Sequence, residues 1–318
     1  MANPKVAFYW AASCGGCEIA VLELGKALVD MSKKVDIVFW PVALDFKYSD
    51  VESMPEKSID VCFFNGAIQT SENEHMAKLL REKSKILIAF GACANGGGIP
   101  ALANTTGREQ IFTRVYKETP TTDNPKGVVP QVKVQVKEGE LTLPEFYNTV
   151  RTLDQTVEVD YSVPGCPPVG EQIAAVMNVV VTGKLPEKGA VLGASDKSVC
   201  DECKRVKGDR KITKIVRTYE IVPDTEKCLI DQGIICMGPA TRGGCGAQCI
   251  KANMPCRGCY GAVPGVLDQG AKMLSALSSN FDADNEEDAA RIADGVVDPI
   301  GTFYRYALAR SLLGRSKA

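Results

Sequence analysis

The distribution of cysteine limits how this chain can fold. Eight of its 13 cysteines fall between Cys200 and Cys259, a segment in which hydrophobic periodicity almost disappears. A segment without a regular apolar pattern has to be held together by something other than an apolar core. The chain therefore divides into a first part that can build an ordinary core and a second part that depends on its cysteines.

Short apolar runs alternate with helical patterns in the first part. This alternation is typical of a parallel sheet that helices cover on both faces. We predict an α/β fold, with a flavodoxin-like parallel sheet domain in residues 1–185 and an irregular, cysteine-rich domain with C-terminal helices in residues 186–318. The boundary is placed in the Gly- and Pro-rich stretch 182–196. The apolar runs cover residues 6–10, 35–40, 59–64, 86–90 and 161–168.

Local patterns predict further elements. Residues 71–83 are expected to form a helix with Ser71 as N-cap and Glu74 as its capping-box partner, and with His75 in solvent. The acidic run 282–288 lacks the glycine and the closing glutamate of a calcium loop, so we expect a solvated helix start there. Other helices are expected at 19–29, from about 171, at 266–277 and at 300–313, with a hairpin around 138–139.

Composition restricts the class of protein. A net charge near −2 with 24% charged residues argues against nucleic-acid and membrane-surface binding. No membrane span or secretory signal is visible, so we expect a cytoplasmic chain whose cysteines bind metal or react rather than form disulfides. His75 is the only histidine, which removes two-histidine zinc sites and a Cys–His catalytic pair.

Four cysteines are expected at one edge of the sheet. Cys14 and Cys17 lie on a predicted strand-to-helix turn, and Cys93 and Cys166 follow two other strands, where parallel sheets bind ligands. A thioredoxin-like dithiol would explain Cys14 and Cys17 but not the other two. Cys62 falls inside a strand and is interpreted as a buried apolar residue.

The eight later cysteines divide in chain order into two further sets of four. Four thiolates bind either a cubane iron–sulfur cluster or a structural zinc ion. On spacing alone, zinc knuckles remain the alternative. Three features favour iron–sulfur clusters: glycine and proline crowd these cysteines, charged residues are sparse from 236 to 259, and a zinc interpretation gives the first set no purpose. The two sets are Cys200, Cys203, Cys228, Cys236 and Cys245, Cys249, Cys256, Cys259.

Three motifs together resemble the small, electron-transferring subunit of [NiFe] hydrogenases, and more loosely the homologous subunit of respiratory complex I. They are CGGCE at 14–18, GACANGGG at 91–98 and PGCPP at 164–168. The downstream motifs CDEC (200–203), the stretch 228–249 and PCRGCYG (255–261) are similar to the region that binds two further clusters in hydrogenases. The resemblance covers about residues 5–262.

Two positions differ from the small subunits of periplasmic uptake [NiFe] hydrogenases and narrow the resemblance to one type of hydrogenase. Cys200 stands where many of them have a histidine, and Cys249 supplies a ligand where they often have proline. The chain is most similar to the small subunit of the methyl-viologen-reducing, deazaflavin-non-reducing hydrogenase of methanogenic archaea. The small subunit of the deazaflavin-reducing enzyme is the nearest alternative.

The resemblance implies three [4Fe-4S] clusters in an iron–sulfur relay. The implied ligand sets are a proximal one (Cys14, Cys17, Cys93, Cys166), a medial one (Cys245, Cys249, Cys256, Cys259) and a distal one (Cys200, Cys203, Cys228, Cys236). Electrons would come from a nickel–iron centre in a separate large subunit and leave, in methanogenesis, to a small iron–sulfur adaptor (delta-type) subunit and a heterodisulfide reductase complex.

Three questions stay open from the sequence. Glu18 either assists proton movement near the subunit contact or compensates the helix N-terminus. A stand-alone iron–sulfur carrier, with a ferredoxin-like module fused to a flavodoxin-like sheet, is the competing function. A zinc-stabilised scaffold is the other.

Overall fold

The computed structural model describes residues 3–208 and 211–313. Its main sheet has five parallel strands in the order β2-β1-β3-β5-β9. Counted along the sheet's own strands this is the order 2-1-3-4-5, which is the flavodoxin-like order. The predicted α/β fold class is therefore confirmed. The strands are β1 (Lys5–Trp10), β2 (Asp36–Phe39), β3 (Ile59–Asn65), β5 (Ser84–Phe90) and β9 (Tyr161–Val163).

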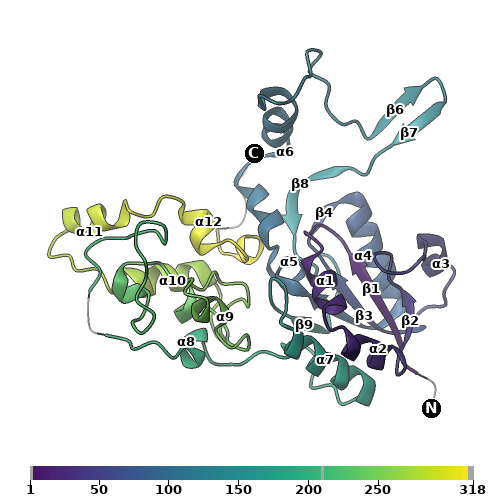
Figure 1. Cartoon of the computed structure of the whole chain (residues 1–318). Helices are drawn as coiled ribbons and strands as arrows, with labels where there is room; N and C mark the ends of the chain where they lie inside the picture. The colour runs from purple at the N-terminus through teal and green to yellow at the C-terminus, as the bar shows by residue number, and fades with distance from the viewer. Residues whose placement is uncertain (1–2, 209–210, 314–318) are drawn as a thin grey trace.

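Helices cover both faces of this sheet, as the apolar runs predict (Figure 1). On β1, Val6 and Phe8 belong to the core under α1 and α7, whereas Ala7 and Tyr9 belong to the core under α3 and α4. Successive side chains of a strand point to opposite faces, so a strand buried on both sides has to be apolar throughout. The covering helices are α1 (Gly16–Leu22), α2 (Lys26–Ser32), α3 (Tyr48–Glu52), α4 (Ser71–Lys83), α5 (Gly91–Gly96) and α7 (Gly170–Thr182).

The helix predicted at 19–29 is wrong as a single element. The chain instead forms α1 and α2, which are separated at Gly25 with φ 54°. An interior helical residue needs negative φ, and only glycine adopts this positive value readily. The apolar spacing continues across the break because Leu28 and Met31 of α2 pack against the same core as α1.

The N-cap of α4 also differs from the prediction by one residue. Thr70 is the N-cap: its Oγ1 accepts from the Asn73 N–H at 3.3 Å, and Asn73 Oδ1 accepts from the Thr70 N–H at 3.2 Å. Threonine and asparagine can make the same reciprocal pair as serine and glutamate. Ser71 is the first helical residue, and its hydroxyl accepts from the Glu145 N–H. His75 is exposed, as predicted.

A second group of elements lies outside the main sheet, and its helix α6 and strands β6 and β7 project away from the main body (Figure 1). It contains the predicted hairpin, in which Val134 pairs with Leu141 and Val136 with Gly139. A short antiparallel pair formed by β4 and β8 connects this excursion to the main body. The elements are β4 (Ile68–Thr70), η1 (Ile99–Thr105), α6 (Arg108–Thr113), η2 (Arg114–Glu118), β6 (Lys133–Val136), β7 (Gly139–Thr142) and β8 (Phe146–Arg151).

The cysteine-rich part is built from short helices and loops beside the sheet (Figure 1). The acidic run does start a helix, with Asn285 as N-cap. The helix predicted at 300–313 is wrong: the chain leaves the helix after Phe303 and forms only one more 3₁₀ turn. The elements are α8 (Val199–Glu202), η3 (Ile230–Gln232), η4 (Gly238–Ala240), α9 (Gln248–Lys251), α10 (Gln269–Ser278), α11 (Glu286–Ala293), α12 (Pro299–Phe303) and η5 (Leu308–Arg310).

The core of this second part is not closed on itself. Leu229, Met237 and Met273 belong to the same cluster as Ala101 and Val150 from the first part. The division at residues 185 and 186 stays a prediction. Over residues 3–208 and 211–313, no helix combines the length and apolar character needed to cross a membrane.

A buried ion pair anchors the start of β9. Asp160 is 1% exposed, and its Oδ2 accepts from Arg81 Nη1 at 2.6 Å and from the Leu87 N–H at 2.8 Å. Burial would raise the pKa of Asp160, but Lys188, the Leu87 N–H and Arg81 together hold it below its usual value. The charged pair therefore ties α4 to two neighbouring strands.

We expect Asp160→Asn to destabilise the chain by about 3–5 kcal/mol, because it removes the charge of a fully buried carboxylate that pairs with the partly buried Arg81 guanidinium. Asp60→Asn is the matched control: Asp60 pairs with Lys85 at 2.7 Å near the surface, where a lost pair costs about 0–1 kcal/mol. Thermal unfolding of the two purified variants compares these values. Equal shifts of the unfolding midpoint would contradict this role of Asp160.

Candidate metal centres

Four strands of the main sheet end at the same level. The pairing register aligns Trp10 with Asn65, Asn65 with Phe90, and Phe90 with Val163. The segments that follow β1, β5 and β9 contain the four cysteines: Cys14 lies in the turn after β1, Cys17 at the start of α1, Cys93 in α5 and Cys166 in the turn after β9. The structure therefore brings the four predicted proximal cysteines to one edge of the sheet, next to the point between β1 and β3 where the strand order reverses. In this kind of sheet, that reversal point is where ligands bind.

Glycines let the sulfur atoms of this set approach the backbone. A Cβ on Gly91, which has φ +86°, would lie 2.3 Å from Cys17 Sγ, and a Cβ on Gly98 would lie 2.5 Å from Cys93 Sγ. Either atom would overlap the sulfur, so no other residue fits these positions without moving a cysteine. Gly15, with φ +77°, turns the chain between Cys14 and Cys17 under the Trp10 ring.

The four thiols also influence one another electrostatically. Burial raises the pKa of Cys17, and the neighbouring Cys93, Cys166 and Cys14 raise it further. The pKa of Cys93 rises to about 12 through burial, with contributions from Cys166 and Cys14. Thiolates this close together repel each other, and the positive charge of a bound metal group would compensate that repulsion and so favour deprotonation of its thiol ligands.

Glu18 follows Cys17 and is completely buried. Its Oε2 accepts a hydrogen bond from Trp40 Nε1 at 2.6 Å, and its Oε1 has no hydrogen-bond partner among the residues that the structure describes. Burial raises its pKa to about 7, although Trp40 and the nearby Asn65 amide act in the opposite direction. Glu18 is thus not a solvated charge at a helix end.

The predicted distal cysteines form a second group. A Cβ on Gly238 would lie 3.2 Å from Cys200 Sγ and 3.6 Å from Cys236 Sγ, so one small residue separates these two sulfur atoms. The pKa of Cys200 is raised to about 11. Burial is the largest cause, the nearby Cys236 is the next, and Cys228 and Cys203 raise it by smaller amounts. Cys236 is buried and the other three are partly exposed.

The predicted medial cysteines form the third group. Burial raises the pKa of Cys259, and Cys256, Cys166, Cys245 and Cys249 add to this in that order. An open cavity of about 680 Å³ is lined by Cys245, Cys249 and Cys259 together with Cys166 of the first group. The first and third groups therefore face a common space.

Direct contacts connect the groups. The Cys256 N–H donates to Cys236 Sγ at 3.3 Å, which joins the third group to the second. The buried Tyr260, next to Cys259, donates from its hydroxyl to Gln172 Oε1 at 2.7 Å and accepts from the Val169 N–H at 3.4 Å. These two bonds join the third group to the chain that follows Cys166.

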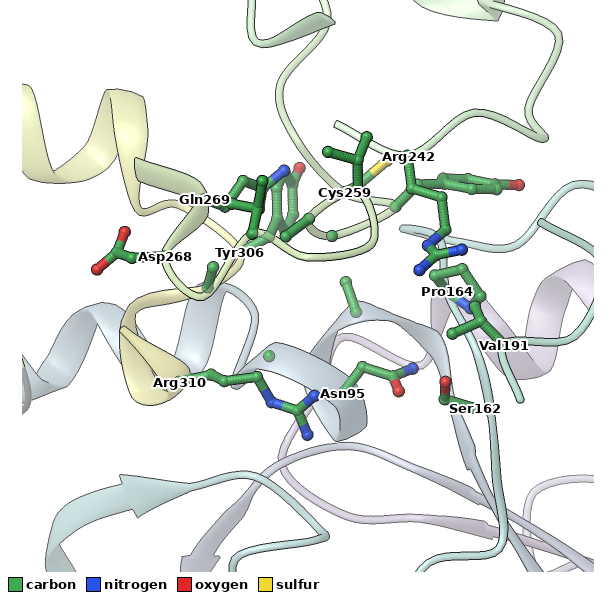
Figure 2. A pocket seen from close by; sticks show the side chains of 18 of the residues that line it. Asn95, Ser162, Pro164, Val191, Arg242, Cys259, Asp268, Gln269, Tyr306 and Arg310 are labelled. Atoms are coloured by element: carbon green, nitrogen blue, oxygen red, sulfur yellow. The ribbon is translucent and has the colours of Figure 1, made fainter. Parts of the chain in front are cut away.

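A smaller cavity lies between the sheet edge and the cysteine-rich part. Its volume is about 280 Å³, and Figure 2 shows Asn95 and Ser162 on one side and Arg242 and Cys259 on the other. Tyr306 also lines it, and the pKa of its hydroxyl is raised by burial and by the nearby Cys166 and Cys259. Sequence reasoning missed the roles of both tyrosines, because only tertiary packing brings Tyr306 to Cys166 and Tyr260 to Gln172.

The remaining cysteine lies apart from all three groups. Cys62 is 0% exposed in the core between the sheet and α4. Among the residues that the structure describes, no three His, Cys, Asp or Glu side chains converge on one point as the ligands of a single metal ion would. The assignment of each cysteine as a ligand stays a prediction.

The donors of each group fit an iron–sulfur cluster chemically. Each group supplies four thiols, and in the proximal and distal groups glycines leave room beside the sulfur atoms. Backbone N–H groups also point at these sulfurs: the pKa of Cys228 is raised by burial and lowered in part by the N–H groups of Ile230 and Asp231. Such hydrogen bonds are one means by which proteins adjust cluster potentials.

Comparison with known proteins places the chain in a family. The model of the family described as NADH ubiquinone oxidoreductase, 20 Kd subunit, matches residues 14–180. The chain is 43% identical over 317 residues to the iron-sulfur subunit of the F420-non-reducing hydrogenase of Archaeoglobus profundus, and the match covers 98% of each chain. The chain belongs to the family of F420-non-reducing hydrogenase iron-sulfur subunits.

Two further similarities agree with this membership. The corresponding subunit of the F420-non-reducing hydrogenase of Methanothermobacter thermautotrophicus is 36% identical, over 97% of this chain and 96% of that one. A crystal structure of an NAD+-reducing [NiFe]-hydrogenase in the H2-reduced state has a similar chain, with 26% identity and a TM-score of 0.50. That match covers 58% of this chain and 95% of the other.

The resemblance drawn from the three cysteine motifs is thus confirmed. The chain is the small subunit of an F420-non-reducing [NiFe] hydrogenase and hence part of an oxidoreductase. F420 is a deazaflavin, so these relatives favour a deazaflavin-non-reducing hydrogenase over the deazaflavin-reducing alternative. Membership in this family also implies a large-subunit partner.

Proposed function

We propose that this subunit relays electrons from H₂ oxidation in the large subunit through three [4Fe-4S] clusters to an iron–sulfur adaptor subunit and a heterodisulfide reductase complex. The single observation that supports it best is the register that gathers Cys14, Cys17, Cys93 and Cys166 at one sheet edge. The clusters would supply one-electron redox chemistry, and the chain would hold them in fixed order. We place this function in the cytoplasm.

The order of the three sets follows from the contacts between them. Cys166 and Cys259 line one cavity, and the Cys256 N–H donates a hydrogen bond to Cys236 Sγ. The proposed sequence is therefore proximal, then medial (Cys245, Cys249, Cys256, Cys259), then distal (Cys200, Cys203, Cys228, Cys236). Tyr260 and Gln172 would keep the proximal and medial sets at a constant separation.

The turn at Cys14 is suited to a contact with the large subunit. Cys14 is exposed, and the strand end before it and the helix α1 after it carry exposed apolar side chains: Trp10 is 42% exposed, Ile19 50% and Leu22 38%. Exposed apolar side chains of this size that gather at one place favour a protein contact. A large subunit seated here would be next to the proximal set.

A stand-alone carrier and a zinc scaffold remain as alternatives to test. A stand-alone carrier would be isolated without a nickel-bearing chain. A zinc scaffold would contain almost no iron and would show no hydrogen-dependent dye reduction.

Cys166→Ser tests the ligand assignment. We expect the variant complex to lose hydrogen-dependent reduction of methyl viologen and the proximal cluster's EPR signal, because one of its four thiolates is gone, while the medial and distal signals remain. Unchanged turnover would show that Cys166 is not a ligand.

Cys62→Ala is the matched control for that experiment. It also removes one thiol, but from the apolar core, where the small cavity costs on the order of 1 kcal/mol. We expect the iron content and dye reduction of this variant to equal those of the unmodified complex. Loss of a whole cluster would refute the exclusion of Cys62 from the metal sites.

Glu18 is the residue of this chain that we propose for proton transfer near the large subunit. It is buried beside the proximal turn and bonded to Trp40. Glu18→Gln preserves the size and the acceptor oxygen but removes the acid, so we expect slower hydrogen–deuterium exchange catalysed by the complex, with the cluster potentials unchanged. Hydrogen–deuterium exchange at the rate of the unmodified complex would show that Glu18 has only a structural role.

A further inference from the structure

Three arginine side chains meet in a crevice on the cysteine-rich part. The crevice has a volume of about 70 Å³, and its lining includes Arg217, Arg257 and Arg305. Arg217 is exposed, whereas Arg257 and Arg305 are half-buried. Three like charges in one small space repel one another, so their convergence requires an explanation.

These charges are not neutralised within the part of the chain that the structure describes. None of the three guanidinium groups makes an ion pair there, whereas Arg81, Arg151, Arg242 and Arg310 all do. The pKa of Arg257 lies below its usual value because of burial and the charges of Arg305 and Arg217.

Three guanidinium groups face one carboxylate in the crevice lining, and a second carboxylate lies three residues after Arg217; within the described residues neither forms an ion pair with these arginines. Asp298 also lines the crevice, but its Oδ1 accepts from the Gly301 N–H at 2.9 Å as the N-cap of α12. Glu220 Oε1 accepts from the backbone N–H of Arg217 at 3.2 Å. The crevice therefore presents an excess of positive charge to solvent.

The walls of the crevice lie against two cysteine groups. Ile234 and Ile235 precede Cys236, and Arg257 follows Cys256. Cys236 is 6% exposed and Cys256 7%, and the two are joined by the bond from the Cys256 N–H to Cys236 Sγ. A protein seated in the crevice would thus approach the medial and distal sets without contacting their sulfur atoms.

Apolar side chains border the same surface. Val297, which lines the crevice, is 77% exposed, and Tyr219 and Val222, one and four residues after the lining residue Thr218, are 82% and 93% exposed. Aromatic side chains and arginine together are enriched at protein interfaces. Since charge and apolar exposure coincide here, the occupant should be a protein with carboxylates.

We infer that this arginine crevice is the docking surface for carboxylate side chains of the protein that accepts electrons from this subunit. Guanidinium groups bind carboxylates in a bidentate geometry, which fixes orientation as well as proximity. The inference rests on the proposed function, and it adds the surface and the chemistry by which the acceptor is recognised.

The test measures reduction of the separately produced iron–sulfur adaptor subunit by the hydrogenase complex under H₂, relative to methyl viologen reduction by the same preparation. In Arg217→Glu and in Arg305→Glu we expect the KM for the adaptor to rise about tenfold or more, because a like charge now faces its carboxylates. Arg217→Lys, which preserves the charge, should restore most of the affinity. For the unmodified complex, the KM should also rise from low to high ionic strength, and this dependence should be weaker in the variants.

Arg291→Glu is the matched control, since Arg291 is an exposed arginine on α11 outside the crevice. It should leave the KM for the adaptor unchanged. An unchanged KM in both Arg217→Glu and Arg305→Glu would overturn the inference, as would an equal rise in Arg291→Glu. Failure of the proposed function is a different result: the unmodified complex would then reduce neither methyl viologen nor the adaptor under H₂.

Discussion

The register of the parallel sheet is the constraint on which the rest of the structure depends. Because β1, β3, β5 and β9 end level with one another, three separate turns deliver four cysteines to the same edge. A slip of two residues in any one pairing would displace a turn by about 7 Å, the length of two strand residues. The two-sided apolar burial of these strands fixes the register and thereby the site.

The cysteine-rich part depends on this sheet in turn. Its core shares a cluster with Ala101 and Val150, and Tyr260 is bonded to Gln172 on α7 and to the Val169 N–H at its start. A relay requires fixed separations between its redox centres, and short loops alone would not provide them. The buried hydrogen bonds and the shared core explain how an irregular segment is held at a constant position against the sheet.

Much of this arrangement could be predicted from the sequence. The apolar runs located the strands because both faces of the sheet are buried, and glycine and proline after Phe90 and Val163 marked the strand ends that Cys93 and Cys166 follow. Gly25 was not recognised as a helix break, since its positive φ leaves no mark in the apolar spacing. Tyr260 and Tyr306 were missed for a different reason: their partners are more than 80 residues away in the chain or in another part of the fold.

The central claim is that twelve of the thirteen cysteines hold three cubane clusters. Quantitation of iron and acid-labile sulfide in the purified subunit, combined with EPR after reduction, tests it most directly. We expect about twelve irons and twelve sulfides per chain, with three interacting cluster signals. About three zinc ions and almost no iron, or iron sufficient for only one cluster, would contradict the account.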